Sequence, residues 1–121
     1  MHYFTNMKKL PARSVYETRA EFLKALAHPG RLQLVDLLAE GEKCVCELAA
    51  ATGYDISTVS RHLSQMKRAA IVDSRRAGTT IYYRLQLSCI RDLFRCVETG
   101  VAERLEQETE RCSCRTVPAR K

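Results

Sequence analysis

Apolar residues recur at helical spacing in several stretches of the chain, and short polar segments containing glycine or proline separate these stretches. The pattern predicts one helix over residues 14–27 and a second over residues 29–40. The break falls at Pro29, because the residue before a proline avoids the helical conformation and proline suits a first helical turn. The predicted inward side chains of the first helix are Val15, Phe22, Leu23 and Leu26. Those of the second helix are Leu32, Val35, Leu37 and Leu38.

A helix-turn-helix pattern follows between residues 44 and 70. A short helix is predicted over residues 44–52, ended by Gly53, which readily takes a left-handed conformation. Its inward side chains are Val45, Leu48 and Ala49. After a turn, Asp55 is a suitable N-cap for a longer helix that begins near Ile56. The buried stripe of this helix, at spacings of four, three and four residues, consists of Val59, Leu63, Met66 and Ala70.

A β-hairpin is predicted next, from two β-favouring runs over residues 71–76 and 80–85 with a glycine turn at residues 77–79. A hairpin this short is barely stable alone, so it should pack on the helices as a wing. A last helix is predicted from Leu87 to about Gln107. Its apolar residues are Ile90, Leu93, Phe94, Val97, Val101 and Leu105. They either pack in the core or pair with a second copy of the chain.

These elements predict a mainly α fold with a β-hairpin wing, that is, a dimeric winged helix-turn-helix. The expected domain organisation is a flexible N-terminal arm over residues 1–13, one DNA-binding and dimerisation domain over residues 14–107, and a polar tail over residues 108–121 that contains Cys112 and Cys114. A two-fold dimer would place its two recognition helices about 34 Å apart, which is one turn of DNA.

Charge points to nucleic acid as the partner. The formal net charge is +6, and residues 61–95 contain eight basic residues and two acidic ones. Such an excess is typical of a phosphate-binding surface. Hydroxyls and bases on one helix also suit phosphates and base edges, although a solvated polar face is the alternative. The candidate DNA contacts on the helix are Ser57, Thr58, Ser60, Arg61, His62, Ser64, Lys67 and Arg68. Those on the hairpin are Arg75, Arg76, Thr79 and Tyr82. For His62 a structural role is equally expected.

Other function classes are disfavoured. No apolar run approaches the length of a membrane span, and the amino terminus lacks the apolar core of a secretory signal, so we expect a cytoplasmic protein without membrane partners. Its six cysteines should then be reduced and available for metal or redox chemistry. We expect no enzyme activity, because the sequence has neither a Cys-x-x-Cys pair nor a glycine-rich phosphate loop.

Four segments in the same order resemble the ArsR/SmtB family of winged-helix, metal-responsive repressors. They are residues 26–32 (LAHPGRL), 42–48 (EKCVCEL), 57–63 (STVSRHL) and 80–85 (TIYYRL). The resemblance implies a cytoplasmic homodimer that covers a palindrome in promoter DNA and leaves it when a metal or metalloid binds. It also argues against the zinc site of the dimer helix in this family, because the corresponding positions here are Leu87, Cys89 and Gly100.

The resemblance further implies that Cys44 and Cys46 bind the inducer. Thiolates favour arsenite, As(III), or another soft ion such as Sb(III), Cd(II) or Pb(II) over hard cations. The arsenic repressors often carry another cysteine three residues after the pair, where this chain has Ala49. Cys112 or Cys114 is the possible third ligand, and the alternatives are an incidental tail or a separate thiol site. On a regular helix, residues two apart point ~200° away from each other, so we expect binding to distort the first helical turn.

Two alternatives concern the cysteines. In the first, the chain is a winged-helix regulator that responds to an organic metabolite or to thiol oxidation instead of a metal. The second concerns Cys89 and Cys96, which are seven residues apart beside the apolar stripe of the last helix and are expected to be packing residues.

Overall fold

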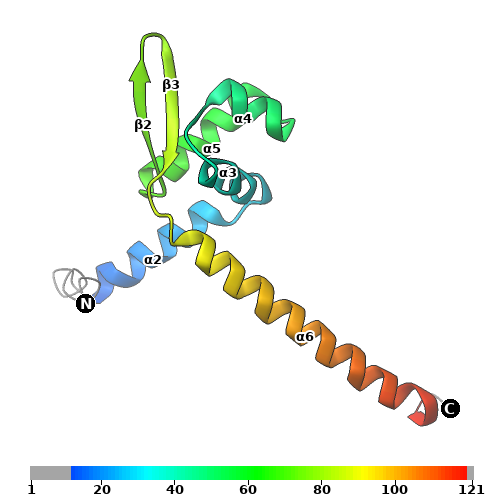
Figure 1. The fold of residues 1–121 in the computed structure, drawn as a ribbon. Helices are drawn as coiled ribbons and strands as arrows, with labels where there is room; N and C mark the ends of the chain where they lie inside the picture. Colours follow the sequence, from blue (N-terminus) through cyan, green and yellow to red (C-terminus); the bar gives the residue numbers. More distant parts are fainter. Residues whose placement is uncertain (1–11, 120–121) are drawn as a thin grey trace. The chain divides into compact units, whose positions relative to one another are not determined.

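The computed structural model describes the backbone of residues 12–119 and the side chains of residues 14–111. Within this range the elements are α2 (Ala12–Leu26), α3 (Pro29–Ala39), β1 (Lys43–Cys44), α4 (Val45–Thr52), α5 (Ile56–Arg68), β2 (Val72–Ala77), β3 (Thr80–Leu85) and α6 (Ile90–Ala119) (Figure 1). The chain divides into two compact units, Met1–Ser88 and Cys89–Lys121. The predicted flexible arm lies almost entirely in residues 1–11, outside the described residues.

The first unit is a small helical body with a hairpin. Helix α4 packs on α5, α3 packs on both of them, and α2 packs on α3 and α5. The strands β2 and β3 extend from this body as a wing (Figure 1). The buried apolar residues of the unit are Ala25, Leu26, Leu34, Val35, Leu38, Leu48, Val59, Leu63, Met66, Ile71 and Val72. The predicted winged helix-turn-helix, mainly helical with a β-hairpin, is confirmed.

The inward face of α3 differs from the prediction. Leu34, Val35 and Leu38 are buried, whereas the predicted Leu32 is exposed. The reason is Gly30, which is buried one helical turn before Leu34. A Cβ at Gly30 would lie 2.9 Å from Cε2 of Tyr54, so the helix approaches that ring closely only because the side chain is absent. A glycine adds nothing to an apolar pattern, so Leu32 was predicted inward in place of Leu34, whereas Val35 and Leu38 were predicted correctly.

Two other positions were also assigned wrongly. Leu23 of α2 was predicted to point inward but is 56% exposed. Ala70 was predicted to end the buried stripe of α5, but the helix ends at Arg68. Ala70 follows it in the left-handed region with φ 63°, where a non-glycine residue is uncommon. Its backbone there turns the chain from α5 toward β2.

The wing belongs to a three-stranded antiparallel sheet in the order β1-β3-β2. The hairpin pairs Val72 with Leu85 at its base and Ala77 with Thr80 at its tip. The predicted hairpin is present, but Ala77, which was predicted in the turn, belongs to β2. Strand β1 was not predicted, because two residues are too few to show alternation. It pairs Cys44 with Tyr82 and so joins the chain before α4 directly to the wing.

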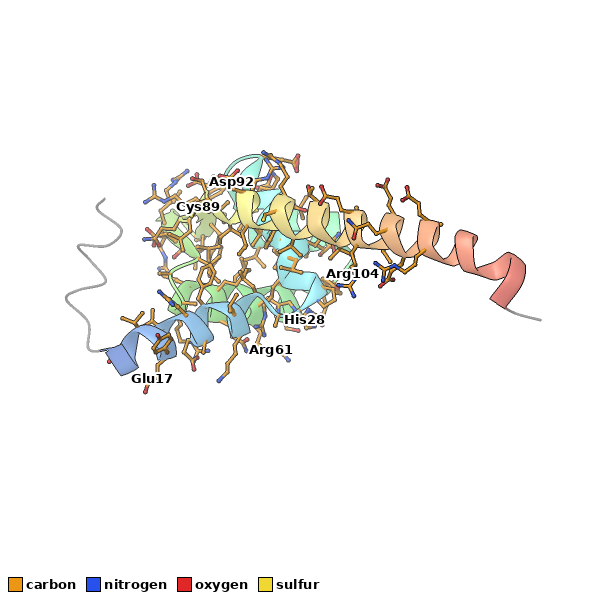
Figure 2. All side chains as sticks on the ribbon, turned by 90° about the horizontal axis from the view of Figure 1, so that it is seen from below. Glu17, His28, Arg61, Cys89, Asp92 and Arg104 are labelled. Carbon is orange, nitrogen blue, oxygen red and sulfur yellow. The ribbon has the colours of Figure 1, made fainter. Side chains whose placement is uncertain are left out.

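Helix α6 forms the regular structure of the second unit and is longer than predicted. It continues to Ala119 because residues 108–117 contain neither glycine nor proline to stop it. Side chains stand off α6 along its described length (Figure 2). The apolar Leu93, Val97, Val101 and Leu105 are between 42% and 57% exposed. No helix in the described part of the chain combines the length and apolar character that a membrane span requires.

Candidate nucleic-acid interface and thiol site

The polar face of α5 presents most of the predicted DNA contacts. Ser57, Arg61, Ser64, Lys67 and Arg68 are exposed, and Thr58 and Ser60 are half-buried. All seven lie on one rigid helix whose opposite face is in the core.

The start of α5 is ordered by Asp55. The hydroxyls of Thr58 and Ser57 hydrogen bond to its carboxylate and lower the pKa of Asp55. The distance from Ser57 Oγ to Asp55 Oδ2 is 3.0 Å. An ionised carboxylate at this position stabilises the exposed amides of the first helical turn. The hydroxyl of Ser57, one of the candidate contacts, is thus already engaged within the chain.

His62 does not belong to this surface. It is 6% exposed, and its Nδ1 accepts a hydrogen bond of 3.1 Å from Nε of Arg31. Its ring centroid lies 4.5 Å from that of His28. Of the two roles expected from the sequence, burial therefore favours the structural one, and His62 is removed from the DNA contacts. Its Nε2 is buried without a hydrogen-bond partner among the described residues.

The burial of His62 gives a pH dependence that can be measured. Burial lowers the pKa of His62, and the positive potentials of His28, Arg31 and Arg61 lower it further. The folded state then binds fewer protons than the unfolded state, so the free energy of unfolding should fall as the pH drops through about 6.5. One proton gives a slope of at most about 1.4 kcal/mol per pH unit. Urea unfolding from pH 8 to pH 5 measures it.

The matched variant is His62→Asn, whose Oδ1 can still accept the Arg31 hydrogen bond but which does not titrate. We expect its stability to change less between pH 7 and pH 5 than that of the wild type. Equal pH dependence in the two proteins would show that another group titrates.

The wing carries the remaining candidates. Arg75, Arg76 and Thr79 are exposed, and Tyr82 is half-buried. Arg75 is engaged within the chain, because its Nη2 lies 2.6 Å from Oε1 of Glu42 and its Nε lies 2.9 Å from both carboxylate oxygens. Its guanidinium also lies over the Tyr82 ring, 4.9 Å from the centroid. The hydrogen bond from Arg75 lowers the pKa of Glu42.

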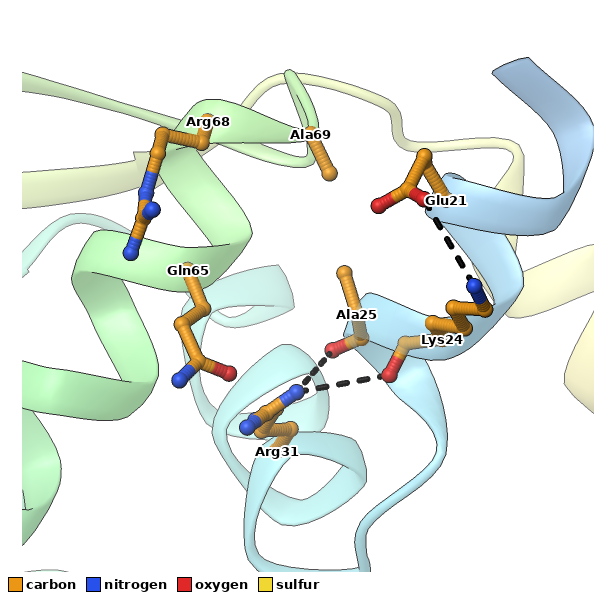
Figure 3. A pocket seen from close by; sticks show the side chains of 7 residues that line it. All are labelled: Glu21, Lys24, Ala25, Arg31, Gln65, Arg68 and Ala69. Carbon is orange, nitrogen blue, oxygen red and sulfur yellow. Dashed lines mark hydrogen bonds and ion pairs between the residues drawn. The ribbon is translucent and has the colours of Figure 1, made fainter. Parts of the chain in front are cut away.

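Two further side chains connect α5 to neighbouring elements. Nζ of Lys67 donates to Oγ of Ser74 at 2.6 Å and so connects α5 to β2. Nη1 of Arg31 donates to the carbonyl oxygens of Lys24 and Ala25 at 3.3 Å, in addition to its bond with His62. The bonds from Arg31 lie at one side of a cleft of about 370 Å³ that is lined by residues of α2, α3 and the end of α5 (Figure 3). No role was predicted for Arg31 or Glu42, because their partners His62 and Arg75 lie 31 and 33 positions away along the chain.

The cysteine pair lies at a junction between strand and helix. Cys44 is half-buried and Cys46 is exposed. Cys44 ends β1 and is the N-cap of α4, with φ −86° and ψ 167°, so the expected pair of cysteines on one regular turn is wrong. Oε1 of Glu47 accepts a 3.0 Å hydrogen bond from the Cys44 backbone N–H. This bond and one from the Cys44 thiol lower the pKa of Glu47.

The other cysteines do not complete a site among the described side chains. No group of three or more His, Cys, Asp or Glu residues there could hold a metal ion. Cys112 and Cys114 fall on helix α6, but their side chains lie outside the described part. Cys89 and Cys96 are exposed, so the expected packing role is wrong for this chain by itself. Their polarisable thiols face solvent instead of filling a core.

Comparison with known proteins agrees with this architecture. The family model of bacterial regulatory proteins of the arsR family matches residues 28–74. The chain is also similar to the solution NMR structure of the homodimeric winged helix-turn-helix DNA-binding domain of Mb0332 from Mycobacterium bovis, a possible ArsR-family transcriptional regulator. The identity is 38% and the TM-score 0.69, over 81% of this chain and 93% of that one. The chain belongs to the ArsR family. The family expected from the four motifs is therefore confirmed.

Two curated relatives match a similar segment. The HTH-type transcriptional regulator Rv0324 of Mycobacterium tuberculosis is 43% identical over 82 residues, which are 68% of this chain and 36% of that protein. The transcriptional repressor SmtB homolog of Synechocystis is 42% identical over 84 residues, which are 69% of this chain and 64% of that protein. The chain thus spans less than two thirds of either relative.

Proposed function

We propose that this ArsR-family protein is a homodimeric transcriptional repressor that binds promoter DNA and leaves it when a thiophilic ion binds Cys44 and Cys46. The observation that carries the proposal is the exposed basic face of α5, supported from behind by a buried stripe. A rigid helix with guanidinium, ammonium and hydroxyl groups on one face suits the major groove of DNA. The wing adds Arg76 and Thr79 for backbone phosphates.

Dimerisation is supported by two observations. The NMR structure similar to this chain is described as homodimeric. In this chain, α6 leaves four apolar side chains about half-exposed at intervals of four residues. Burying such a face in a two-fold dimer would stabilise the pair and present two recognition helices to one side of the duplex.

The proposed inducer is arsenite or another soft ion, and the donor set supports this class. Cys44 and Cys46 are both free thiols, and Cys46 is accessible to solvent. Thiolates select soft ions over magnesium or calcium. Cys112 or Cys114, from the same subunit or the partner, would supply a third sulfur. Soft-ion binding displaces the thiol proton, so the thiol of Cys44 could no longer donate to Glu47.

The structure supports a path from this pair to the DNA surface that differs from the expected unwinding of a helical turn. Cys44 is the partner of Tyr82 in the sheet, so a displacement of β1 acts on the wing. Cys46 lies in α4, and α4 packs on α5. A displacement of Cys46 therefore also acts on the recognition helix. A coupling of ~1–3 kcal/mol between the two sites would change DNA affinity about 5- to 150-fold.

The test is fluorescence anisotropy of labelled promoter DNA titrated with arsenite, cadmium and zinc in turn. We expect arsenite or cadmium to weaken DNA binding of the wild type about 5- to 150-fold. The double variant Cys44→Ser/Cys46→Ser should bind DNA, and its DNA affinity should stay the same when the ion is added. The matched control is Cys89→Ser/Cys96→Ser, which should respond like the wild type. DNA binding that ignores all three ions would defeat the inducer proposal.

A second candidate is regulation by thiol oxidation, favoured by the exposure of Cys46, Cys89 and Cys96. Absorption spectra separate the two, because a bound soft ion gives thiolate charge-transfer bands and oxidation does not. If a mild oxidant releases DNA while cadmium gives neither release nor such a band, the oxidation candidate replaces the first.

A further inference from the structure

One row of side chains crosses all three strands of the sheet. Cys44 of β1 is the partner of Tyr82 in β3, and Tyr82 is the partner of Arg75 in β2. Directly paired residues of antiparallel strands lie on the same face of a sheet. Glu42 lies two residues before Cys44 and reaches over this row to Arg75, from which it is separated by 33 positions in the sequence. We call Glu42, Tyr82 and Arg75 the wing clamp.

The wing clamp occupies the Nε–Nη2 edge of the Arg75 guanidinium and one of its faces. Its Nε and Nη2 both donate to Glu42, and its planar guanidinium lies over the Tyr82 ring. The Glu42 side chain is 29% exposed and that of Arg75 is 57% exposed. Charge-assisted, forked hydrogen bonds of this kind are stronger and more directional than single ones.

A DNA phosphate that bound the Nε–Nη2 edge of Arg75 would need the same donors. The guanidinium fork matches carboxylate and phosphate geometry equally well, so the two anions compete for one edge of the group. We infer that Glu42 is a positioning residue that keeps the Nε–Nη2 edge of Arg75 from DNA, so that a phosphate binds this edge only after Glu42 releases it. This inference rests on the proposed DNA binding. Beyond that proposal, it assigns to the acidic residue Glu42 a role in setting the affinity of the wing for DNA.

The wing offers a matched control in its second ion pair. Nη2 of Arg84 lies 3.3 Å from Oδ2 of Asp73, a single contact between partner residues of the hairpin. Asp73→Asn therefore removes one negative charge from the wing, as Glu42→Gln does, but leaves Arg75 clamped. Any general effect of lowering negative charge near DNA should appear in both variants.

The experiment is anisotropy of a labelled mixed-sequence duplex over a series of salt concentrations. Glu42→Gln should bind roughly two- to fivefold more tightly than Asp73→Asn, the size typical of an exposed ion pair. Its dependence of log affinity on log salt should be steeper by about one, because one more phosphate is contacted. In an Arg75→Gln background, Glu42→Gln should increase the DNA affinity by no more than Asp73→Asn does.

A direct readout of the clamp comes from the Nε–H resonance of Arg75 in 15N NMR spectra. We expect this resonance to move in Glu42→Gln and, in the wild type, on addition of the duplex, and to stay in place in Asp73→Asn. The inference alone would be overturned if Glu42→Gln and Asp73→Asn gained equal DNA affinity. It would also be overturned if the gain of Glu42→Gln persisted in the Arg75→Gln background. Wild-type protein that binds no duplex would overturn both the inference and the proposed function.

Discussion

Replacing Leu63 by alanine is expected to lower the free energy of unfolding by about 2–5 kcal/mol. Leu63 is fully buried on the inner face of α5, between Val59 and Met66, which are buried as well. Helix α5 packs against α2, α3, α4 and β2, so a cavity here weakens the contacts of most of the first unit. Urea unfolding followed by circular dichroism measures the loss as a lower midpoint with an unchanged slope.

The control is Ser64→Ala, one position further along the same helix but exposed. Alanine is the better helix former, so this variant should change stability by no more than about 0.5 kcal/mol. A Leu63→Ala variant that unfolds at the wild-type midpoint would contradict the burial of this face of α5.

Helix α5 could be predicted well because its signals are local. Asp55 is the N-cap residue of α5, although its side chain makes no capping hydrogen bond, and the buried Val59, Leu63 and Met66 follow at the predicted spacing. The hairpin was equally predictable, since β-favouring runs flank a turn at Gly78, whose φ is 65°. The helical and hairpin periods and the turn residues are all contained within a few neighbouring positions.

Features that depend on distant partners could not be predicted. Burial of Gly30 follows from the ring of Tyr54, and burial of His62 follows from Arg31 and His28. In the candidate site, the sequence identified the cysteine pair but placed Cys44 inside a helix. Its pairing with Tyr82 is a contact across 38 positions, which no local pattern reveals. The same holds for the Glu42–Arg75 pair, so the sequence showed Arg75 only as an available base.

Replacing Arg61 by alanine is expected to weaken DNA binding by about 1–3 kcal/mol, that is, about 5- to 150-fold. Arg61 is exposed near the amino-terminal half of α5, the part of a recognition helix that meets base edges. Alanine preserves the helix, so the loss should appear in affinity and not in stability. Anisotropy with promoter DNA at several salt concentrations measures it.

The control for Arg61→Ala is Arg104→Ala, which removes the same charge from α6, where Arg104 pairs with Glu108 at 3.2 Å. It should leave the affinity nearly unchanged. The pattern of loss also identifies the contact of Arg61. A base contact makes the variant lose discrimination between promoter and mixed-sequence DNA, whereas a phosphate contact weakens both equally and lowers the salt dependence by about one. If Arg61→Ala and Arg104→Ala weaken binding alike, net charge and not the face of α5 determines affinity, and the recognition surface must lie elsewhere.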